Sequence, residues 1–262
     1  MKSEKTGMAG SGKGKGAGKA SAGKMASRLE CAILVGGLGT RLRPLTYDIP
    51  KPLVQVNGKP FLGYLLERVA DMGIRKVTLL TGYKGGMVED YCGNGSAWGL
   101  DISYSREPKP LGTGGALLKA SRQVESDCLV LNGDTYLDIN LGEAERAHRE
   151  SKALATIVCM EGSLKDRGAV VVGQGGHVKS FLEKQHGGED LFNTGAFIIS
   201  QKGMEQLAKI AEGKGLGEAF STEMDIFPEL VKLAGLYAVV AKGKFLDMGT
   251  FESLAKAGEI IS

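Results

Sequence analysis

The sequence lacks the features that mark membrane, secreted and zinc-binding proteins. None of its apolar runs approaches the length of a membrane-spanning helix, and no apolar stretch follows the N-terminal lysines as a secretory signal would require. Only four cysteines occur among 262 residues, widely spaced and without a CxxC pair, so neither a disulfide framework nor a zinc site is expected. We therefore expect buried free thiols and a cytoplasmic location, with no membrane partner.

Histidine is also scarce, which narrows the choice of acid–base chemistry. The chain has three, His148, His177 and His186, and none stands near the end of a predicted strand in its first half. We expect surface or structural roles for all three rather than catalysis.

The net charge of +3 conceals two regions of opposite sign. Residues 1–28 contain six Lys, one Arg and one Glu, so the remainder carries three more acidic than basic side chains. Residues 1–29 are rich in Gly, Lys, Ser and Ala without apolar periodicity, and we expect a disordered tail. Its composition would suit a polyanion, but an upstream extension without such a role is favoured, because Met25 is a plausible start. No nucleic-acid partner is expected.

Apolar runs and amphipathic segments alternate from residue 30 onward, as in an α/β protein. We expect strands at 31–35, 76–81, 102–105, 128–131, 153–160, 192–199, 237–241 and 243–246, with a hairpin of 169–172 and 177–183. Helices are expected at 60–72, 87–91, 114–124, 142–151, 204–211 and 226–233, and at the end of the chain. One domain of residues 30–262 should contain a doubly wound, mostly parallel, Rossmann-like sheet in residues 30–150 and an antiparallel-rich lobe in residues 151–262.

A phosphate-binding pocket is predicted at the glycine-rich segment 36–39, which follows the first strand. Glycines there let backbone N–H groups approach a phosphate closely. The segment is neither a dinucleotide fingerprint, because Leu42 stands where the third glycine should be, nor a P-loop, because no Gly-Lys-Ser/Thr follows at the required spacing. Arg41 and Lys51 add positive charge nearby. The alternative is an ordinary glycine turn between a strand and a helix.

Two aspartates stand at the ends of predicted strands, where open α/β sheets bind their ligands. Asp134 follows the strand 128–131, and Asp247 follows the strand 243–246. Two carboxylates that face one polyphosphate are what Mg²⁺ needs, since that ion binds through one or two carboxylates, phosphate oxygens and water. Each aspartate taken alone could equally cap a helix or a turn.

Four segments together resemble the sugar-1-phosphate nucleotidyltransferase family: 36–54, 107–116, 132–135 and 245–250. The resemblance covers nearly all of residues 30–262. It implies an enzyme that joins a nucleoside triphosphate to a sugar 1-phosphate, giving a nucleotide-sugar and pyrophosphate. A sugar-phosphate oxygen would attack the α-phosphorus in line, with catalysis by positioning and charge neutralisation rather than by a covalent nucleophile.

The resemblance also implies roles for single residues and for the two halves, the first binding nucleotide and the second sugar phosphate. Arg41, Lys51 and Lys184 would be catalytic, acting on the departing pyrophosphate, the triphosphate and the sugar phosphate respectively, with Mg²⁺ on Asp134 and Asp247. Nucleotide-binding residues would be Leu34, Gly36, Gly37, Gly39, Thr40, Glu107, Gly112 and Thr113; sugar-binding residues would be Gly168, Glu183, Asn193 and Thr194. Gln185 replaces the family's proline, and the alternative for the Glu-Lys pair is a solvated hairpin edge.

Glu107 favours guanine as the base. In relatives that use thymidine or uridine triphosphates, the position that matches Glu107 looks like Gln. An amide both donates and accepts hydrogen bonds, which suits a pyrimidine. A carboxylate only accepts, which suits the N1–H and N2–H₂ groups of guanine together. The alternative is that Glu107 merely opens a Pro-containing turn.

The sugar is predicted by resemblance alone. Segments 56–62 and 131–139 look most like the D-glycero-α-D-manno-heptose 1-phosphate guanylyltransferases, with mannose-1-phosphate guanylyltransferases close behind. Glucose-1-phosphate thymidylyl- or uridylyltransferase activity and a catalytically silent nucleotide-sugar sensor are further alternatives. The expected partners are GTP, or another nucleoside triphosphate, and a sugar 1-phosphate. We expect a monomer or homodimer that serves cell-surface polysaccharide synthesis.

Overall fold

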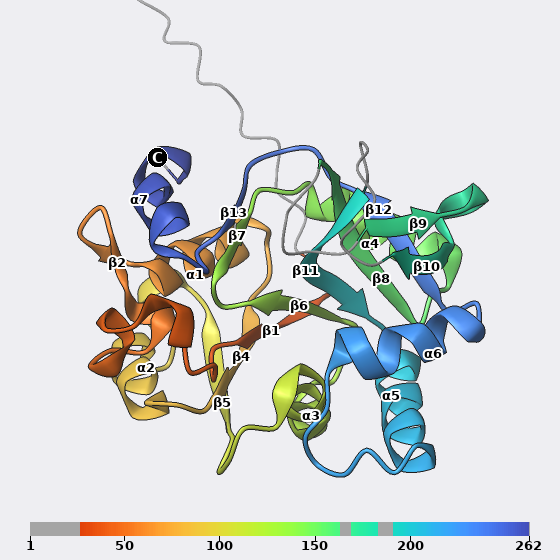
Figure 1. The fold of residues 1–262 in the computed structure, drawn as a ribbon, viewed down its shortest axis with the longest axis horizontal. Coiled ribbons are helices and arrows are strands. Elements are labelled where there is room, and N and C mark those ends of the chain that lie inside the picture. The colour runs from red at the N-terminus through yellow and green to blue at the C-terminus, as the bar shows by residue number, and fades with distance from the viewer. Residues whose placement is uncertain (1–26, 163–168, 183–190, 262) are drawn as a thin grey trace, which may run out of the picture.

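A nine-stranded sheet forms the centre of the molecule (Figure 1). The computed structural model describes residues 27–162, 169–182 and 191–261. Seven strands follow the order β10-β9-β11-β6-β1-β4-β5, while β8 pairs with β11 and β12. The predicted basic tail falls almost wholly outside the described residues.

The first half supplies four parallel strands, in the order β6-β1-β4-β5. Their bounds are Glu30–Leu34 for β1, Lys76–Thr81 for β4, Asp101–Arg106 for β5 and Cys128–Asn132 for β6. The apolar run of β1 is buried between its two neighbours, as in parallel sheets covered on both faces. From β1 the chain adds β4 and β5 on one side and β6 on the other. The topological switch point therefore lies between β1 and β6, where such sheets bind ligands.

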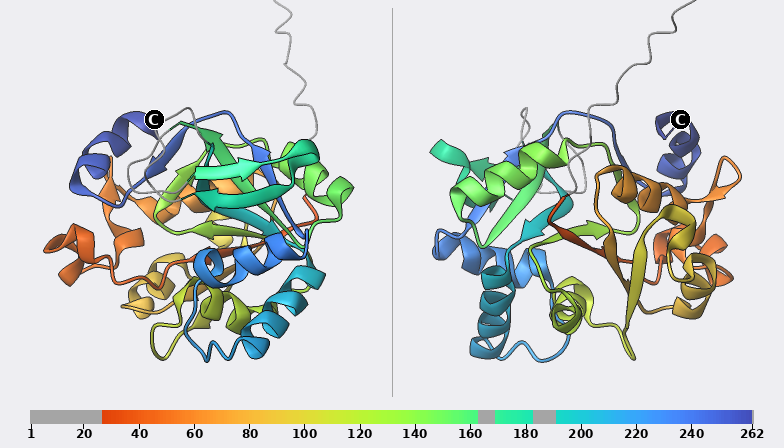
Figure 2. Two further views of the ribbon diagram at one scale, coloured as in Figure 1. Left: turned by 45° about the vertical axis from the view of Figure 1, so that its right-hand side comes forward. Right: turned by 180° about the vertical axis from the view of Figure 1, so that it is seen from behind.

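Helices cover both faces of this sheet. They are α1 Phe61–Asp71, α2 Gly85–Cys92, α3 Gly112–Ala120, α4 Leu141–Ser151, α5 Gln201–Gly213, α6 Phe227–Lys232 and α7 Phe251–Ile260. Side chains of α1 and α4 belong to one buried apolar cluster, and those of α3, α5 and α6 belong to a second. The C-terminal helix α7 returns to the first half of the chain, where Asn57 Nδ2 donates to the carbonyl of Gly258 at 3.0 Å (Figure 2). The doubly wound α/β prediction is confirmed.

The second half adds mostly antiparallel strands to the same sheet. They are β8 Ala155–Glu161, β9 Ala169–Val172, β10 Val178–Leu182, β11 Leu191–Ile199 and β12 Leu236–Val240. Strand β11 joins the halves because it pairs antiparallel with β6. The predicted hairpin is confirmed as β9–β10. Strand β12, in contrast, runs parallel to β8.

Two short ribbons lie outside the main sheet, and of their four strands the sequence predicted only β13, as the strand 243–246. Strand β7, Thr135–Leu137, pairs antiparallel with β13, Phe245–Asp247, and β2, Gln55–Val56, pairs with β3, Lys59–Pro60. The β7–β13 pairing sets Asp247 opposite Thr135. The N–H of Met248 also donates to the carbonyl of Asp134 at 2.8 Å. This ribbon therefore brings the two strand-end aspartates of the sequence to one place.

All four cysteines are buried and free, as expected. Burial raises the pKa of the Cys92 and Cys159 thiols to about 12, so these groups stay protonated and unreactive near neutral pH. Among the described residues, no helix is both long enough and apolar enough to cross a bilayer.

Candidate active site

A cavity of about 360 Å³ opens at the carboxyl ends of β1 and β6. Its lining includes eight residues singled out from the sequence: Leu34, Gly36, Gly37, Lys51, Glu107, Gly112, Thr113 and Asp134. Val35, Leu38, Pro52, Pro110, Asn132 and Gly133 complete it. Segments far apart in the sequence meet here because β1 and β6 are neighbours, with Leu34 aligned to Asn132. The cavity occupies the switch point of the sheet.

Two glycines let the loops at this edge pack against one another. A Cβ on Gly36 would lie 2.7 Å from Glu107 Oε1 and 3.1 Å from the Gly82 nitrogen. A Cβ on Gly133 would lie 2.6 Å from the carbonyl oxygen of Leu34. No side chain fits at either position without moving its neighbours, so glycine here keeps the cavity open at the strand ends.

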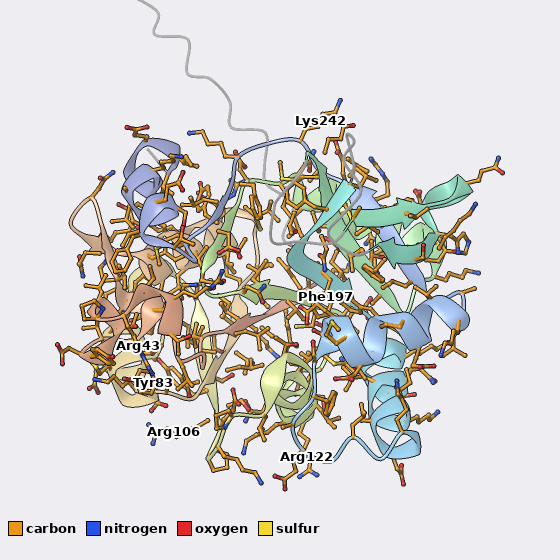
Figure 3. The ribbon with its side chains drawn as sticks, in the orientation of Figure 1. Arg43, Tyr83, Arg106, Arg122, Phe197 and Lys242 are labelled. Atoms are coloured by element: carbon orange, nitrogen blue, oxygen red, sulfur yellow. The ribbon has the colours of Figure 1, made fainter. Side chains whose placement is uncertain are left out.

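The loop after Gly37 is held to the sheet by its own polar groups and by residues after β4. Thr46 Oγ1 donates to the carbonyl of Gly39 at 2.8 Å. The Tyr83 hydroxyl donates to the carbonyl of Thr46 at 3.3 Å, and Lys84 Nζ donates to that of Asp48 at 2.8 Å. Figure 3 labels Arg43 and Tyr83 on the side of the view where α2 lies. These contacts fix a segment that would otherwise be an open surface loop.

Lys51 and Asp134 form an ion pair that lines the cavity. Lys51 begins the short 3₁₀ turn Lys51–Leu53, and only 8% of the residue is exposed. Asp134 is the second residue after β6, in a turn with Gly133. The pair joins the Pro-Lys-Pro segment to the switch point and sets a buried ammonium beside a carboxylate.

Arg41 and Asp247 meet at Gly249, outside the cavity lining. A Cβ on Gly249 would lie 2.8 Å from Arg41 Nη2 and 2.8 Å from Asp247 Oδ1. Both side chains therefore pack against the bare Cα of this glycine. Thr40 and Arg41 form the exposed 3₁₀ turn Thr40–Leu42, which Leu42 holds down by its buried side chain.

Asp134 and Asp247 would suit a Mg²⁺ ion whose coordination shell is completed by phosphate oxygens. Asp134 lines the cavity, and the β7–β13 ribbon brings Asp247 beside the same turn. Within the described ranges there is no cluster of three or more acidic, histidine or cysteine side chains that would form a protein-only cage. An ion bound here would take one or two carboxylates and complete its shell with phosphate and water oxygens.

Glu107 has two roles in the geometry of the cavity. Its Oε2 accepts a hydrogen bond from the N–H of Leu111 at 2.7 Å, which closes the Pro-containing turn. Its Oε1 faces Gly36 in the cavity lining. Burial raises the pKa of the Glu107 carboxyl above its usual value, against the opposing effects of the Leu111 N–H and of Lys119. The carboxylate therefore holds the loop and also borders the space that a ligand would fill.

Two predicted sugar-binding residues are described, Asn193 and Thr194, and neither lines this cavity. Asn193 and Thr194 belong to β11, where a bulge interrupts the register between Asn193 and Phe197. Thr194 is fully buried, and its hydroxyl donates to the carbonyl of Val158 at 2.8 Å, so its side chain holds the bulge. Asn193 Oδ1 accepts from the N–H of Gly195 at 3.0 Å. Gly168, Glu183 and Lys184 lie outside the described residues.

Thr222 and Glu223, which contact Thr113 at the cavity rim, were not predicted from the sequence. Thr113 Oγ1 bonds to Thr222 Oγ1 at 2.9 Å and donates to Glu223 Oε2 at 2.9 Å. Thr222 and Glu223 begin the π-helical turn Thr222–Ile226, a kind of turn that is frequent at functional sites. The only sequence signal was a run of hydroxyl and acidic residues, which equally marks a helix N-terminus.

The sequence matches a known protein family over nearly all of residues 30–262. The model of the family described as Nucleotidyl transferase matches residues 31–262. The chain belongs to this family. A curated relative, D-glycero-alpha-D-manno-heptose 1-phosphate guanylyltransferase of Aneurinibacillus thermoaerophilus, is 35% identical over 230 residues, which is 87% of this chain and 96% of the relative. Mannose-1-phosphate guanylyltransferase of Mycobacterium tuberculosis is 34% identical over 87% of this chain and 63% of its own length.

The solved structures agree with this family assignment. HddC from Yersinia pseudotuberculosis is 33% identical and superimposes with a TM-score of 0.76, covering 89% of this nucleotidyl transferase and 100% of HddC. A second crystal structure holds HddC in complex with GMP-PN. The nucleotidyltransferase fold and enzyme class expected from the sequence are thereby confirmed.

Proposed function

We propose that this nucleotidyl transferase transfers GMP from GTP to D-glycero-α-D-manno-heptose 1-phosphate and releases pyrophosphate. The observation that carries the proposal is the similarity to a heptose 1-phosphate guanylyltransferase over 96% of that relative's length. The GMP-PN complex of HddC supports a guanine nucleotide. The cavity at the switch point, with its buried lysine, is the candidate site of transfer.

The proposed mechanism depends on bringing two anions together. Lys51 would neutralise the triphosphate, since its ammonium is buried in the cavity lining. Arg41 would bind the departing pyrophosphate. Asp134 and Asp247 would hold Mg²⁺, which supplies charge neutralisation at phosphate oxygens when bound. No protein nucleophile is required, because an oxygen of the sugar phosphate attacks the α-phosphorus and pyrophosphate leaves from the opposite side.

Glu107 is the proposed specificity residue for guanine. Its Oε1 borders the cavity, and a carboxylate can accept from the N1–H and N2–H₂ groups of guanine. Its Oε2 is already bonded to the Leu111 N–H, so the base would contact the other oxygen or share this one. The contact would be strong because a partly buried carboxylate is a better acceptor than a neutral group.

A matrix of nucleoside triphosphates against sugar 1-phosphates tests the proposal. Each cell is scored by pyrophosphate release with Mg²⁺, and the product is identified by mass. The expected result is the highest kcat/KM for GTP with the heptose 1-phosphate. No turnover in any cell would refute the enzyme proposal and favour a nucleotide-sugar sensor.

Mannose 1-phosphate is the second candidate acceptor. The 34% identity to a mannose-1-phosphate guanylyltransferase favours it, although this chain covers only 63% of that relative. The same matrix separates the two sugars. The four buried free thiols suit a cytoplasmic enzyme, and we propose a monomer or homodimer that supplies a nucleotide-sugar for cell-surface polysaccharide.

A further inference from the structure

A segment of the second half lies across the loop that borders the nucleotide side of the cavity. We call residues 218–223 the strap. The N–H of Phe220 donates to the carbonyl of Leu111 at 2.9 Å, and the N–H of Gly114 donates back to the carbonyl of Phe220 at 2.9 Å. An ion pair of Lys109 with Glu218 at 2.6 Å adds a contact at the outer end. The strap thus bonds to both sides of the turn that begins α3.

The glycines of this loop receive the strap. Gly112 has φ +69°, and a Cβ on it would lie 2.5 Å from the carbonyl oxygen of Phe220. A Cβ on Gly114 would overlap the Phe220 ring, and one on Gly115 would overlap the carbonyl oxygen of Glu218. The absence of side chains at these positions lets a second backbone approach closely. The N–H groups of Gly114 and Gly115, in the first turn of α3, both donate to the carbonyl of Phe220, at 2.9 and 3.4 Å.

A single carboxylate oxygen completes the junction. Glu223 Oε2 accepts from Thr113 Oγ1 at 2.9 Å, from Thr222 Oγ1 at 2.8 Å and from Ser221 Oγ at 3.0 Å. The Thr113 hydroxyl in turn accepts from the N–H of Thr222 at 2.9 Å. The Thr113 hydroxyl therefore both donates and accepts a hydrogen bond, which fixes the position of this side chain. Hydrogen bonds to a charged acceptor are stronger than neutral ones.

We propose that Glu223 is a positioning residue for the nucleotide. By fixing Thr113, it sets the place of the cavity rim at Gly112 and Thr113, both of which line the cavity. Nucleotide affinity then depends on a segment of the half that was expected to bind sugar phosphate. The inference rests on the proposed function, because it takes the cavity to be the nucleotide site.

Three variants and one control test the inference. Thr113→Val removes the hydroxyl and keeps the shape, Glu223→Gln keeps the volume and removes the charge, and Thr113→Ser restores the hydroxyl. Glu229→Gln is the matched control, because the Glu229 carboxylate pairs with Lys214 and Lys232, away from the cavity lining. Each protein is measured for GTP binding by calorimetry, for both KM values, for kcat and for thermal midpoint.

We expect Thr113→Val to weaken GTP binding and raise its KM about tenfold, with Glu223→Gln acting in the same direction and the KM for sugar 1-phosphate unchanged. Glu229→Gln should match the wild type, whereas Thr113→Ser, which keeps the hydroxyl, should lose much less GTP affinity than Thr113→Val. Combining Thr113→Val with Glu223→Gln should cost little more than the larger single effect, because the two remove one interaction.

Two outcomes would overturn the inference: unchanged GTP binding in Thr113→Val and Glu223→Gln, or equal rises in both KM values with a lowered midpoint, which indicate a purely structural role. A wild type that binds GTP but turns over no sugar 1-phosphate would refute the proposed reaction, while the binding data still decide the role of Glu223. A wild type that binds no nucleotide would refute both.

Discussion

Lys51 and Asp134 form an ion pair at the end of β6, joining the Pro-Lys-Pro turn to the switch point of the sheet. The pair sets opposite charges at the candidate site of phosphoryl chemistry. One group suits phosphate oxygens, and the other suits the metal ion that accompanies them. A triphosphate with Mg²⁺ would give each of them a new partner.

Removing the buried ammonium should abolish most turnover. We expect Lys51→Met to lower kcat about 10²- to 10³-fold, because a preorganised charge at the reacting phosphates is lost. Pyrophosphate release at saturating substrates measures the effect. Lys76→Met is the control, since this lysine is exposed and pairs with Glu125 at the opposite end of the sheet. Equal kcat in Lys51→Met and the wild type would contradict a catalytic role.

The Mg²⁺ concentration needed for activity should depend on the carboxylate of Asp134. Asp134→Asn is expected to raise the Mg²⁺ concentration for half-maximal activity roughly tenfold or more, because a neutral amide is a weaker ligand than a carboxylate. A Mg²⁺ titration of initial rate measures it, and chelation with EDTA should stop the wild type. Activity that persists in EDTA would argue against a metal-assisted reaction.

Gly249→Ala should separate catalysis from stability. The new methyl group would displace the end of the Arg41 side chain and the Asp247 carboxylate, both 2.8 Å from it. We expect kcat to fall by up to about 10²-fold, because small misplacements of charged groups at a reacting centre are costly. The free energy of unfolding should change by no more than about 1 kcal/mol, since the displaced atoms are the ends of two side chains rather than backbone. Urea unfolding and steady-state rates together check both.

Glu107 should make nucleotide choice sensitive to pH. Burial raises the pKa of this carboxyl above the ordinary 4.5, so it takes up a proton at a higher pH than a surface glutamate does. A protonated carboxyl accepts guanine N–H groups poorly. GTP affinity should therefore be present at neutral pH and fall on acidification, already above pH 4.5. GTP binding measured across pH tests this expectation.

The matched variant for that measurement is Glu107→Gln. It should use GTP less well relative to UTP or dTTP, and its binding should lack the acidic transition. An unchanged nucleotide preference would remove the proposed guanine contact, leaving Glu107 with its hydrogen bond to Leu111 alone.

His148 should limit stability in acid. Its Nδ1 lies 2.8 Å from Thr156 Oγ1, and burial lowers its pKa below the ordinary 6.5 despite the nearby carboxylates of Asp127 and Glu145. Between pH 6.5 and the lower pKa of the folded chain, the unfolded chain binds a proton that the folded chain does not. The free energy of unfolding therefore decreases as the pH is lowered through this range. Urea unfolding over a pH series should show this loss in the wild type and a weaker dependence in His148→Gln. Parallel curves for the two proteins would contradict it.

The parallel strands could be predicted because the composition of each strand alone indicates its structure. Residues 76–81 are rich in β-branched and apolar side chains, among them Val77, Leu79 and Leu80, and the structure gives β4 the same bounds. The three residues of β7 are too few to show such a pattern, and their partner strand lies more than 100 residues later. Such a ribbon depends on tertiary pairing, which single-sequence periodicity does not contain.

The site residues that could be predicted are glycines and charged residues that stand at or near the ends of predicted strands. Gly36, Lys51 and Asp134 were placed from residue type and position alone, and the cavity gathers them. Glu223 could not be found this way, because its partner Thr113 is 110 residues distant and hydroxyl-rich segments commonly begin helices. Thr194 faces the core because of a bulge in β11, and bulges change which side chains face a given surface.

The pairing of β11 with β6 has a consequence for how the chain is made. During synthesis the first half emerges before β11, and until then Cys128, Leu129 and Val130 present an open strand edge to solvent. An apolar edge of this kind is a template for pairing with other chains. Expression and chaperone demand should therefore be sensitive to changes in β11 that delay docking, even where the finished enzyme is stable and active. Truncation near residue 150 should yield aggregates rather than a small nucleotide-binding protein.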